Sequence, residues 1–306
     1  MPAAHSPPPS LSVVVASYNS RDTIGNCLLS LRRQETQRAF EILVVDSSTD
    51  GTEQWLEQHF PDMPMVHDER RLFAGDARNR GIAATRAPVI AFMDADCTVG
   101  RDWVEEVLAA HGSGNDVVTG IVDNGSRGSA VGWTYYFCEF NLWFPSGKPR
   151  TVPEAPGCCL SISRAVFDRY GPFLGGTYCS DTAFHWKLQR NGKGAFYSPR
   201  IQVFHHTSGT FASLLKHVFS HRRYFARVKC SEHRLTPVRR WLELAFLPAS
   251  PVLLMGAVGL RLRRCLPYLP IFAGVSPLVF LSFVARALGE ADGYLRPQNR
   301  DNLPGD

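Results

Sequence analysis

Three segments near the start of the chain are almost continuously apolar. They span residues 11–16 (LSVVVA), 41–46 (EILVVD) and 89–93 (VIAFM). Runs of this kind, rich in β-branched side chains, predict strands buried on both faces of a sheet. Between them, apolar residues recur at helical spacing, as at Ile24, Leu28 and Leu31. The alternation predicts an α/β fold with a mostly parallel sheet flanked by helices, because parallel strands are joined by right-handed helical crossovers.

Polar clusters follow these three strands directly. They cover residues 17–20, 46–50 and 94–96. In open parallel sheets, ligands bind at the carboxyl ends of the strands. We therefore expect the three clusters to form one rim around a binding site.

The middle of the chain has a less regular pattern. Residues 123–156 are rich in Gly, Pro and aromatic residues and predict an irregular stretch, whose aromatics either line an acceptor site or belong to the core. Beyond it we expect a strand and then a helix over 160–167, a helix over 181–189, and a short strand over 201–204 that ends in His205-His206.

The character of the sequence changes after residue 210. A basic helical stretch over 217–240 precedes two uncharged apolar segments, 244–260 and 266–285, joined by a connector with three arginines. Two full crossings of a bilayer would put this connector outside, against the positive-inside rule. The pattern favours a membrane-associated hairpin that lies in the cytoplasmic leaflet or its interface. A buried helical subdomain or an oligomer interface is the alternative.

Composition narrows the class of protein. Hydrophobic residues make up 44% and charged residues 20%, which excludes a disordered chain and a collagen-like repeat. The net charge of only +5 does not indicate a nucleic-acid partner. None of the eight cysteines forms a CxxC pair, so we expect reduced, buried thiols in the cytosol. Residues 1–10 hold four prolines and do not resemble a signal peptide.

Carboxylates supply the first candidate chemistry. Asp94 and Asp96 lie two residues apart after a buried strand, where they could share a divalent cation and its diphosphate ligand, or form only a solvated turn. Asp46 ends a strand and could accept a hydrogen bond from a base or a ribose. Asp181 follows a Gly-containing loop at a helix start and could act as a general base, or simply cap the helix.

Three further side chains complete the candidates. Tyr18 could stack on a nucleobase or pack against a neighbouring loop. Arg78 could bind a diphosphate or belong to a solvated helix face. His205 could ligate a metal or contact a phosphate, or be structural. The signatures of P-loop kinases, serine hydrolases and HExxH metalloproteases are absent from the sequence.

Taken in order, these motifs resemble the inverting family 2 glycosyltransferases, which have the GT-A fold. The resemblance covers residues 11–210 and is carried by segments 12–19, 44–52, 77–81, 92–96, 157–164, 180–182 and 199–205. It implies a metal-dependent hexosyltransferase that uses a nucleotide-sugar donor, expected to be a UDP-sugar. The acceptor would be a hydroxyl group, on a lipid-linked compound or a cell-envelope glycan.

The resemblance also implies a role for each site residue. Asp181 would deprotonate the acceptor, and Asp96 with His205 would hold Mg2+ or Mn2+. Tyr18 and Asp46 would hold the base with help from Arg78, and Asp94 would contact the ribose or the donor sugar. The implied donor-binding set is Ala16, Tyr18, Asn19, Asp46, Arg78 and Asp94.

The sequence departs from the family pattern at three places. The motif at 46–52 is one residue short, which leaves open whether Asp46 reads the base. Ser180 stands where the family usually has Glu, and no Gln-x-x-Arg-Trp follows, so we expect a single sugar transfer rather than polymer extension.

These observations predict three parts and leave two rival functions. The parts are a flexible leader (1–10), a GT-A domain (11–210) and a membrane-associated segment (211–306) at the cytoplasmic face of a membrane. One rival is a nucleotidyltransferase on a related sheet, although the loop at 17–20 lacks the Gly-rich, basic character it needs. The other is a non-catalytic, membrane-bound nucleotide-sugar-binding module. The sequence does not indicate the oligomeric state.

Overall fold

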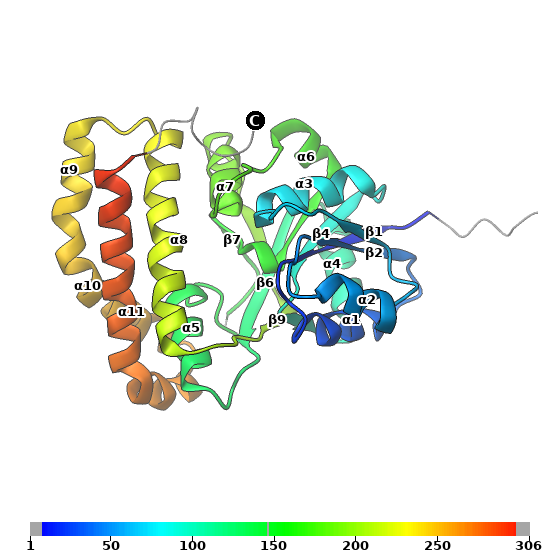
Figure 1. The fold of residues 1–306 in the computed structure, drawn as a ribbon, viewed down its shortest axis with the longest axis horizontal. Coiled ribbons are helices and arrows are strands. Elements are labelled where there is room, and N and C mark those ends of the chain that lie inside the picture. The colour runs from blue at the N-terminus through cyan, green and yellow to red at the C-terminus, as the bar shows by residue number, and fades with distance from the viewer. Residues whose placement is uncertain (1–7, 146, 298–306) are drawn as a thin grey trace, which may run out of the picture.

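A sheet flanked by helices and a group of C-terminal helices beside it make up the protein (Figure 1). The computed structural model describes residues 8–145 and 147–297. Most of the predicted leader, residues 1–7, therefore lies outside the described residues. The strands are β1 (Leu11–Ser17), β2 (Phe40–Asp46), β3 (Met65–His67), β4 (Val89–Asp94), β5 (Cys97–Val99), β6 (Val117–Asn124), β7 (Arg150–Val152), β8 (Leu160–Ser163) and β9 (Ala195–His205). The helices are α1 (Ile24–Arg32), α2 (Thr52–His59), α3 (Ala74–Ala84), α4 (Trp103–Gly112), α5 (Ala130–Glu139), α6 (Arg164–Tyr170), α7 (Ser180–Arg190), α8 (Phe211–Glu232), α9 (Pro237–Phe246), α10 (Ser250–Leu262) and α11 (Leu269–Leu295).

The sheet has the order β3-β2-β1-β4-β8-β6-β9-β5, and β7 pairs with β9. Its first four strands are parallel, as the sequence predicts. Antiparallel pairs join β8 to β4 and β6, and β5 and β7 to β9. Strands β6 and β9 pair in parallel. The α/β architecture is confirmed, and short antiparallel pairs make the sheet a mixed one. The added antiparallel strands β5, β7 and β8 are three or four residues long, too short to give a periodic pattern.

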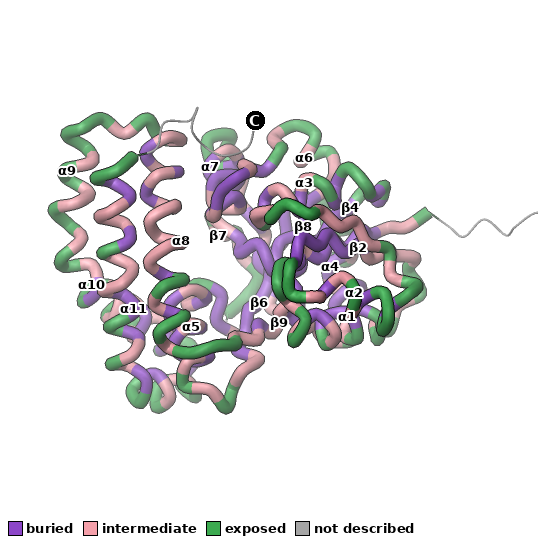
Figure 2. Tube along the Cα trace, viewed as in Figure 1, coloured by how far each residue is buried: buried purple, intermediate pink, exposed green. Residues whose placement is uncertain are grey.

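Strand β1 shows why its sequence is continuously apolar. Leu11, Val13 and Val15 pack into one core, and Val14 packs into a second core on the opposite face of the sheet. All four side chains are fully buried, and buried residues run along the central strands in Figure 2. The register pairs Ser17 with Asp46 and Ala16 with Asp94. The strand ends therefore meet at one edge, as expected for a common rim.

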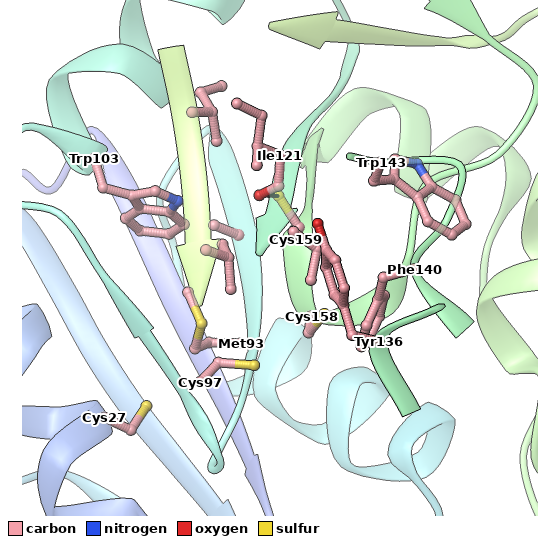
Figure 3. Close-up of a cluster of buried hydrophobic side chains, with 14 of the residues drawn as sticks. Cys27, Met93, Cys97, Trp103, Ile121, Tyr136, Phe140, Trp143, Cys158 and Cys159 are labelled. Atoms are coloured by element: carbon pink, nitrogen blue, oxygen red, sulfur yellow. Dashed lines mark hydrogen bonds between the residues drawn. The ribbon is translucent and has the colours of Figure 1, made fainter. Parts of the chain in front are cut away.

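The stretch over 123–156 is only partly irregular, because it contains one helix and the short strand β7. Residues 130–139 form α5, whose N-cap Ser129 accepts a hydrogen bond from the Gly132 N–H at 3.1 Å. Tyr136, Phe140 and Trp143 are buried in a cluster that includes Cys158 and Cys159 (Figure 3). These three aromatics thus belong to the core, and Trp143 also lines a cavity described below. All eight cysteines are free and buried, as expected.

The C-terminal part consists of α8 to α11. Helices α8 and α11 pack side by side (Figure 1). Two glycines of α11 allow this close approach. A Cβ atom at Gly289 would lie 2.2 Å from the Phe219 carbonyl oxygen, and one at Gly293 would lie 2.4 Å from that of Arg223.

Two helical segments of this part are long and apolar enough to cross a membrane. They span Pro237–Leu262 and Leu266–Leu295, with mean hydropathies of 1.6 and 1.9, and only 11% and 28% of the respective windows are buried. Length and composition alone carry this finding, and core helices of soluble proteins can pass the same test. Their large exposed apolar side chains include Trp241, Phe246, Leu253, Leu260 and Leu269. The predicted alternative of a subdomain buried within the chain is therefore wrong for α9 and α10, and a bilayer or a second protein remains to cover them.

The glycine contact gives a test of how the helical part is held together. We expect Gly289→Ala to lower the free energy of unfolding by about 1–3 kcal/mol, because the new methyl group meets backbone of α8 that cannot rotate away. Gly274→Ala on the same helix is the control, since its Cβ would have no neighbour within 4 Å. That variant should be neutral or slightly stabilising. Chemical unfolding in detergent compares them, and equal effects of the two substitutions would contradict the proposed close packing.

Candidate active site

The Asp94-Ala95-Asp96 turn lies where β4 ends, beside the end of β1. Arg78 of α3 donates a hydrogen bond from Nη2 to Asp94 Oδ1 at 3.2 Å. Burial raises the pKa of Asp94, and Arg78 opposes the rise; Asp96 and Asp181 add to it, and His205 also opposes it. These mutual effects show that one small region holds three carboxylates, a guanidinium and an imidazole.

Gly157 leaves room for the Arg78 side chain in this region. A Cβ atom at residue 157 would lie 2.1 Å from Arg78 Nη2, so only glycine fits against the buried guanidinium. The sequence offers no side chain at Gly157 that could mark this role. Its importance becomes visible only from the Arg78 contact.

Asp96 and His205 form the candidate metal centre. Asp96 Oδ2 lies 3.4 Å from His205 Nε2, and the ligand atoms of Asp96, Cys97 and His205 all lie within 4.8 Å of one another. His205 Nδ1 is buried without a hydrogen-bond partner in the described part of the chain. Burial raises the pKa of the Cys97 thiol well above its usual range. The carboxylate of Asp96 and the imidazole of His205 could hold Mg2+ or Mn2+.

Asp181 lies in the first turn of α7 and is not its N-cap. The N-cap is Cys179, which has a left-handed backbone with φ 62°. Asp181 Oδ2 accepts a hydrogen bond from the Gly157 N–H, and Oδ1 accepts one from the Thr182 N–H, both at 2.9 Å. Gly157 thus touches both Arg78 and Asp181, and it joins the donor side of the rim to the candidate base.

Asp46 has a different environment from the one expected. Its side chain is fully buried and accepts hydrogen bonds from Ser17 Oγ at 2.5 Å and from His67 Nδ1 at 2.9 Å. Ser48 donates two more, from Oγ at 2.6 Å and from its N–H at 3.0 Å. Contact between Asp46 and the base stays a prediction, and neighbouring groups already donate four hydrogen bonds to this carboxylate. Its carboxylate holds the ends of β1 and β3 and the loop after β2 in one arrangement.

The remaining donor candidates lie on the loop after β1. The Ala16 carbonyl accepts a hydrogen bond from the Ala95 N–H at 3.2 Å, which ties this strand end to the Asp94–Asp96 turn. Asn19, with φ 50°, accepts from the Thr49 N–H at 2.9 Å and donates from its own N–H to Ser48 Oγ at 2.7 Å. These contacts shape the loop after β1.

Tyr18 is 39% exposed, and an arginine that the sequence did not single out covers its ring. The Arg71 Cζ atom lies 4.6 Å from the Tyr18 ring centroid, and Arg71 Nη2 donates to the Tyr178 hydroxyl at 3.0 Å. Tyr18 is thus neither a bare stacking platform nor a buried aromatic. Arg71 and Tyr178 lie 107 residues apart in the chain, and no local motif marks either.

Residues 12–171 match the model of Glycosyl transferase family 2, which covers more than half of the chain. The chain belongs to this family. It is a glycosyltransferase, and its mixed α/β sheet is of the GT-A type.

Similar proteins agree with this assignment. Glycosyltransferase AglE of Haloferax volcanii is 26% identical over 255 residues, 79% of this chain and 83% of that protein. The uncharacterized glycosyltransferase YfnE of Bacillus subtilis is 34% identical over 110 residues, 35% of this chain and 28% of that protein.

Two solved structures share the fold. Mannosyltransferase PcManGT from Pyrobaculum calidifontis, in complex with GDP-Man and Mn2+, has a TM-score of 0.59 at 19% identity and covers 93% of this chain and 88% of its own. TarS (1–349) of S. aureus, in complex with UDP-GlcNAc, has a TM-score of 0.51 at 16% identity, with 91% and 90% covered.

Proposed function

We propose that this family 2 glycosyltransferase is a non-processive, inverting enzyme that moves one sugar from a nucleotide-sugar donor to an acceptor hydroxyl. The convergence of side chains on Asp94 carries the proposal. Arg78 binds this carboxylate directly, and the charges of Asp96, His205 and Asp181 all act on it. Nucleotidyl transfer does not agree with the family, and the experiments below test the binding-module alternative.

The donor side is formed by Arg78, Asp94 and the loop after β1. Asp94 would bind the ribose or the donor sugar, and Arg78 would hold the diphosphate while neutralising Asp94. Tyr18, covered by Arg71, would contact the base. The two similar structures hold a GDP-sugar and a UDP-sugar. A UDP-sugar remains our proposal for this chain.

Asp96 and His205 would hold a divalent cation, Mg2+ or Mn2+. A Mn2+ ion in the similar mannosyltransferase structure supports this assignment. When bound, such an ion supplies charge that stabilises a departing diphosphate. The buried Nδ1 of His205, which has no hydrogen-bond partner among the described residues, agrees with a cation site here.

Asp181 would be the general base. Its two hydrogen bonds from the Gly157 and Thr182 N–H groups fix the carboxylate at the rim. The acceptor oxygen attacks the anomeric carbon on the face opposite the nucleotide, and its proton passes to Asp181. The bond from the anomeric carbon to the diphosphate oxygen breaks, so the configuration of the sugar inverts.

The proposal assigns a separate role to each of the two parts of the chain. Residues 11–210 would form the catalytic domain, and 211–306 would attach it to the cytoplasmic face of a membrane. The exposed apolar faces of α9 and α10 support attachment in the plane of one leaflet.

A donor screen tests the proposal. In detergent, one nucleotide sugar among UDP-, GDP- and dTDP-sugars should raise the melting temperature of the protein, and Mn2+ should increase this shift. We expect Asp96→Ala to weaken metal-dependent donor binding by about tenfold or more, because the substitution removes one of the two proposed metal ligands.

Asp62→Ala is the control for the donor screen, since that side chain is 74% exposed and pairs only with Arg32 among the described residues. It should leave the donor response unchanged. No response to any nucleotide sugar, or full Mn2+ dependence in Asp96→Ala, would contradict the donor site proposed here.

A further inference from the structure

A cavity of about 570 Å³ lies between the catalytic domain and the end of α10. One wall comes from the segment between α5 and β7 and from β7 with the residues after it; the other comes from the end of α10 and the connector to α11. Four arginines line it: Arg150, Arg261, Arg263 and Arg264. Glu154 is its one acidic lining residue.

The four guanidinium groups are not neutralised by carboxylates. Arg261 donates a hydrogen bond to the neutral Asn141 Oδ1, and the Arg150 Cζ atom lies 4.0 Å from the centre of the Tyr197 ring. No carboxylate of residues 8–145 or 147–297 lies within ion-pair distance of any of the four. By contrast, Arg222 and Arg286 nearby in the helical part pair with Glu139 and Glu290. The cavity therefore carries a positive excess, and guanidinium groups bind phosphate oxygens through paired donors.

Apolar side chains form the rest of the lining. They are Leu142, Trp143, Phe144, Val152 and Leu260. Leu260 is 59% exposed and continues into the open apolar surface of α10, where Val252 and Leu253 are also exposed. A small soluble anion would not use this wall. A phosphate joined to a long hydrocarbon chain would use both the arginines and the apolar surface.

Glu154 connects the cavity to the candidate active site. Burial raises the pKa of Glu154, and the charge of Asp181 adds to that rise. Glu154 lines the cavity and stands three residues before Gly157, whose N–H donates to Asp181 Oδ2 at 2.9 Å. An acceptor held in the cavity would have its reactive end on the Asp181 side of the rim.

We propose that this cavity binds the phosphate of a lipid-linked acceptor, with the hydrocarbon chain lying along the exposed face of α10. The proposal rests on the function proposed above, because it gives that reaction its class of acceptor. The arginines hold the phosphate at the membrane surface, and they place the acceptor hydroxyl towards Asp181.

Vesicle flotation of the full chain tests this site without donor or metal. The phosphatidylcholine vesicles are plain, or contain a polyisoprenyl phosphate, or contain phosphatidylglycerol at equal surface charge. We expect the tightest binding to polyisoprenyl phosphate, and about tenfold weaker binding to it by Arg263→Ala/Arg264→Ala. Arg261 is left in place because it is half-buried and bonded to Asn141. Attachment to plain vesicles should stay unchanged, since it depends on the apolar faces.

The control is Arg33→Ala/Arg38→Ala, which also removes two positive charges, but from the exposed surface of the catalytic domain. This control variant should still bind vesicles with polyisoprenyl phosphate more tightly than the other vesicles. Equal binding to phosphatidylglycerol would overturn the proposal, as would an equal loss in the control variant or tight binding of inorganic pyrophosphate with no preference among vesicles. Because flotation uses no nucleotide sugar, a failure here is distinguishable from a failure of the donor screen.

Discussion

Replacing Asp181 by Asn is expected to slow sugar transfer by about 10²–10⁴-fold while nucleotide-sugar binding stays intact. Asn keeps the size of the side chain and an oxygen that can accept the Gly157 N–H, so the loop at Gly157 and its contact with Arg78 should persist. What is lost is the ability to take a proton from the acceptor hydroxyl. Initial rates of transfer and the donor-induced shift in melting temperature separate the two effects.

Two other carboxylates sharpen this test. Asp102→Asn changes an exposed residue at the start of α4 and should transfer sugar at the normal rate. Glu154 is the rival base, because it precedes the Gly157 segment that is bonded to Asp181 and burial raises its pKa. If Glu154→Gln abolished transfer and Asp181→Asn did not, the assignment of the base would be wrong. Normal catalysis in both variants would favour a non-catalytic role for this rim.

The sequence predicts the central strands, whose side chains pack into hydrophobic cores on both faces of the sheet, as in β1. Val13, Val14 and Val15 are all apolar because they alternate between opposite faces of the sheet, and this leaves a clear signal. The polar residues that follow such strands must share an edge. Asp94 and Ala16 are therefore brought together as expected, with Arg78 added from the helix that crosses over.

Other parts of the site depend on contacts that a local pattern does not contain. A carboxylate at the end of β2 suggests a ligand contact. In the structure, Asp46 accepts hydrogen bonds from Ser17 and His67, which lie 29 and 21 residues away in the chain. Likewise, Arg71 reaches the site through the loop before α3 and is fixed by Tyr18 and Tyr178. The helix α5 was missed because its aromatic residues pack against distant elements, which override weak local preferences.

The charges between α5, α8 and α11 hold the helical part against the catalytic domain. Glu139 of α5 lies 3.5 Å from Arg222 of α8, and both side chains are mostly buried. Burial alone would raise the pKa of Glu139, but Arg222, His221, Arg286 and His217 outweigh it and lower the pKa to about 2. Glu139 is therefore a buried anion that the surrounding cations strongly favour.

We accordingly expect Glu139→Gln to lower the free energy of unfolding by about 3 kcal/mol, because it leaves Arg222 buried without its counter-charge. Removing both charges in Glu139→Gln/Arg222→Met should recover most of the loss, since a neutral pair avoids the cost of burying ions. Chemical unfolding in detergent measures both variants. A double variant as unstable as the single one would show that shape, not charge, holds this contact.

The lowered pKa of Glu139 also predicts how the stability difference between the wild-type protein and Glu139→Gln depends on pH. A carboxylate with a depressed pKa contributes its stability above the unfolded value, here 4.5, and loses it as the pH falls towards 2. The stability difference between the wild-type protein and Glu139→Gln should therefore be constant near neutral pH and shrink below pH 4.5. A difference that stayed constant down to the lowest measurable pH would mean that Glu139 does not act as an anion. The contact between α5 and the C-terminal helices would then depend on packing alone.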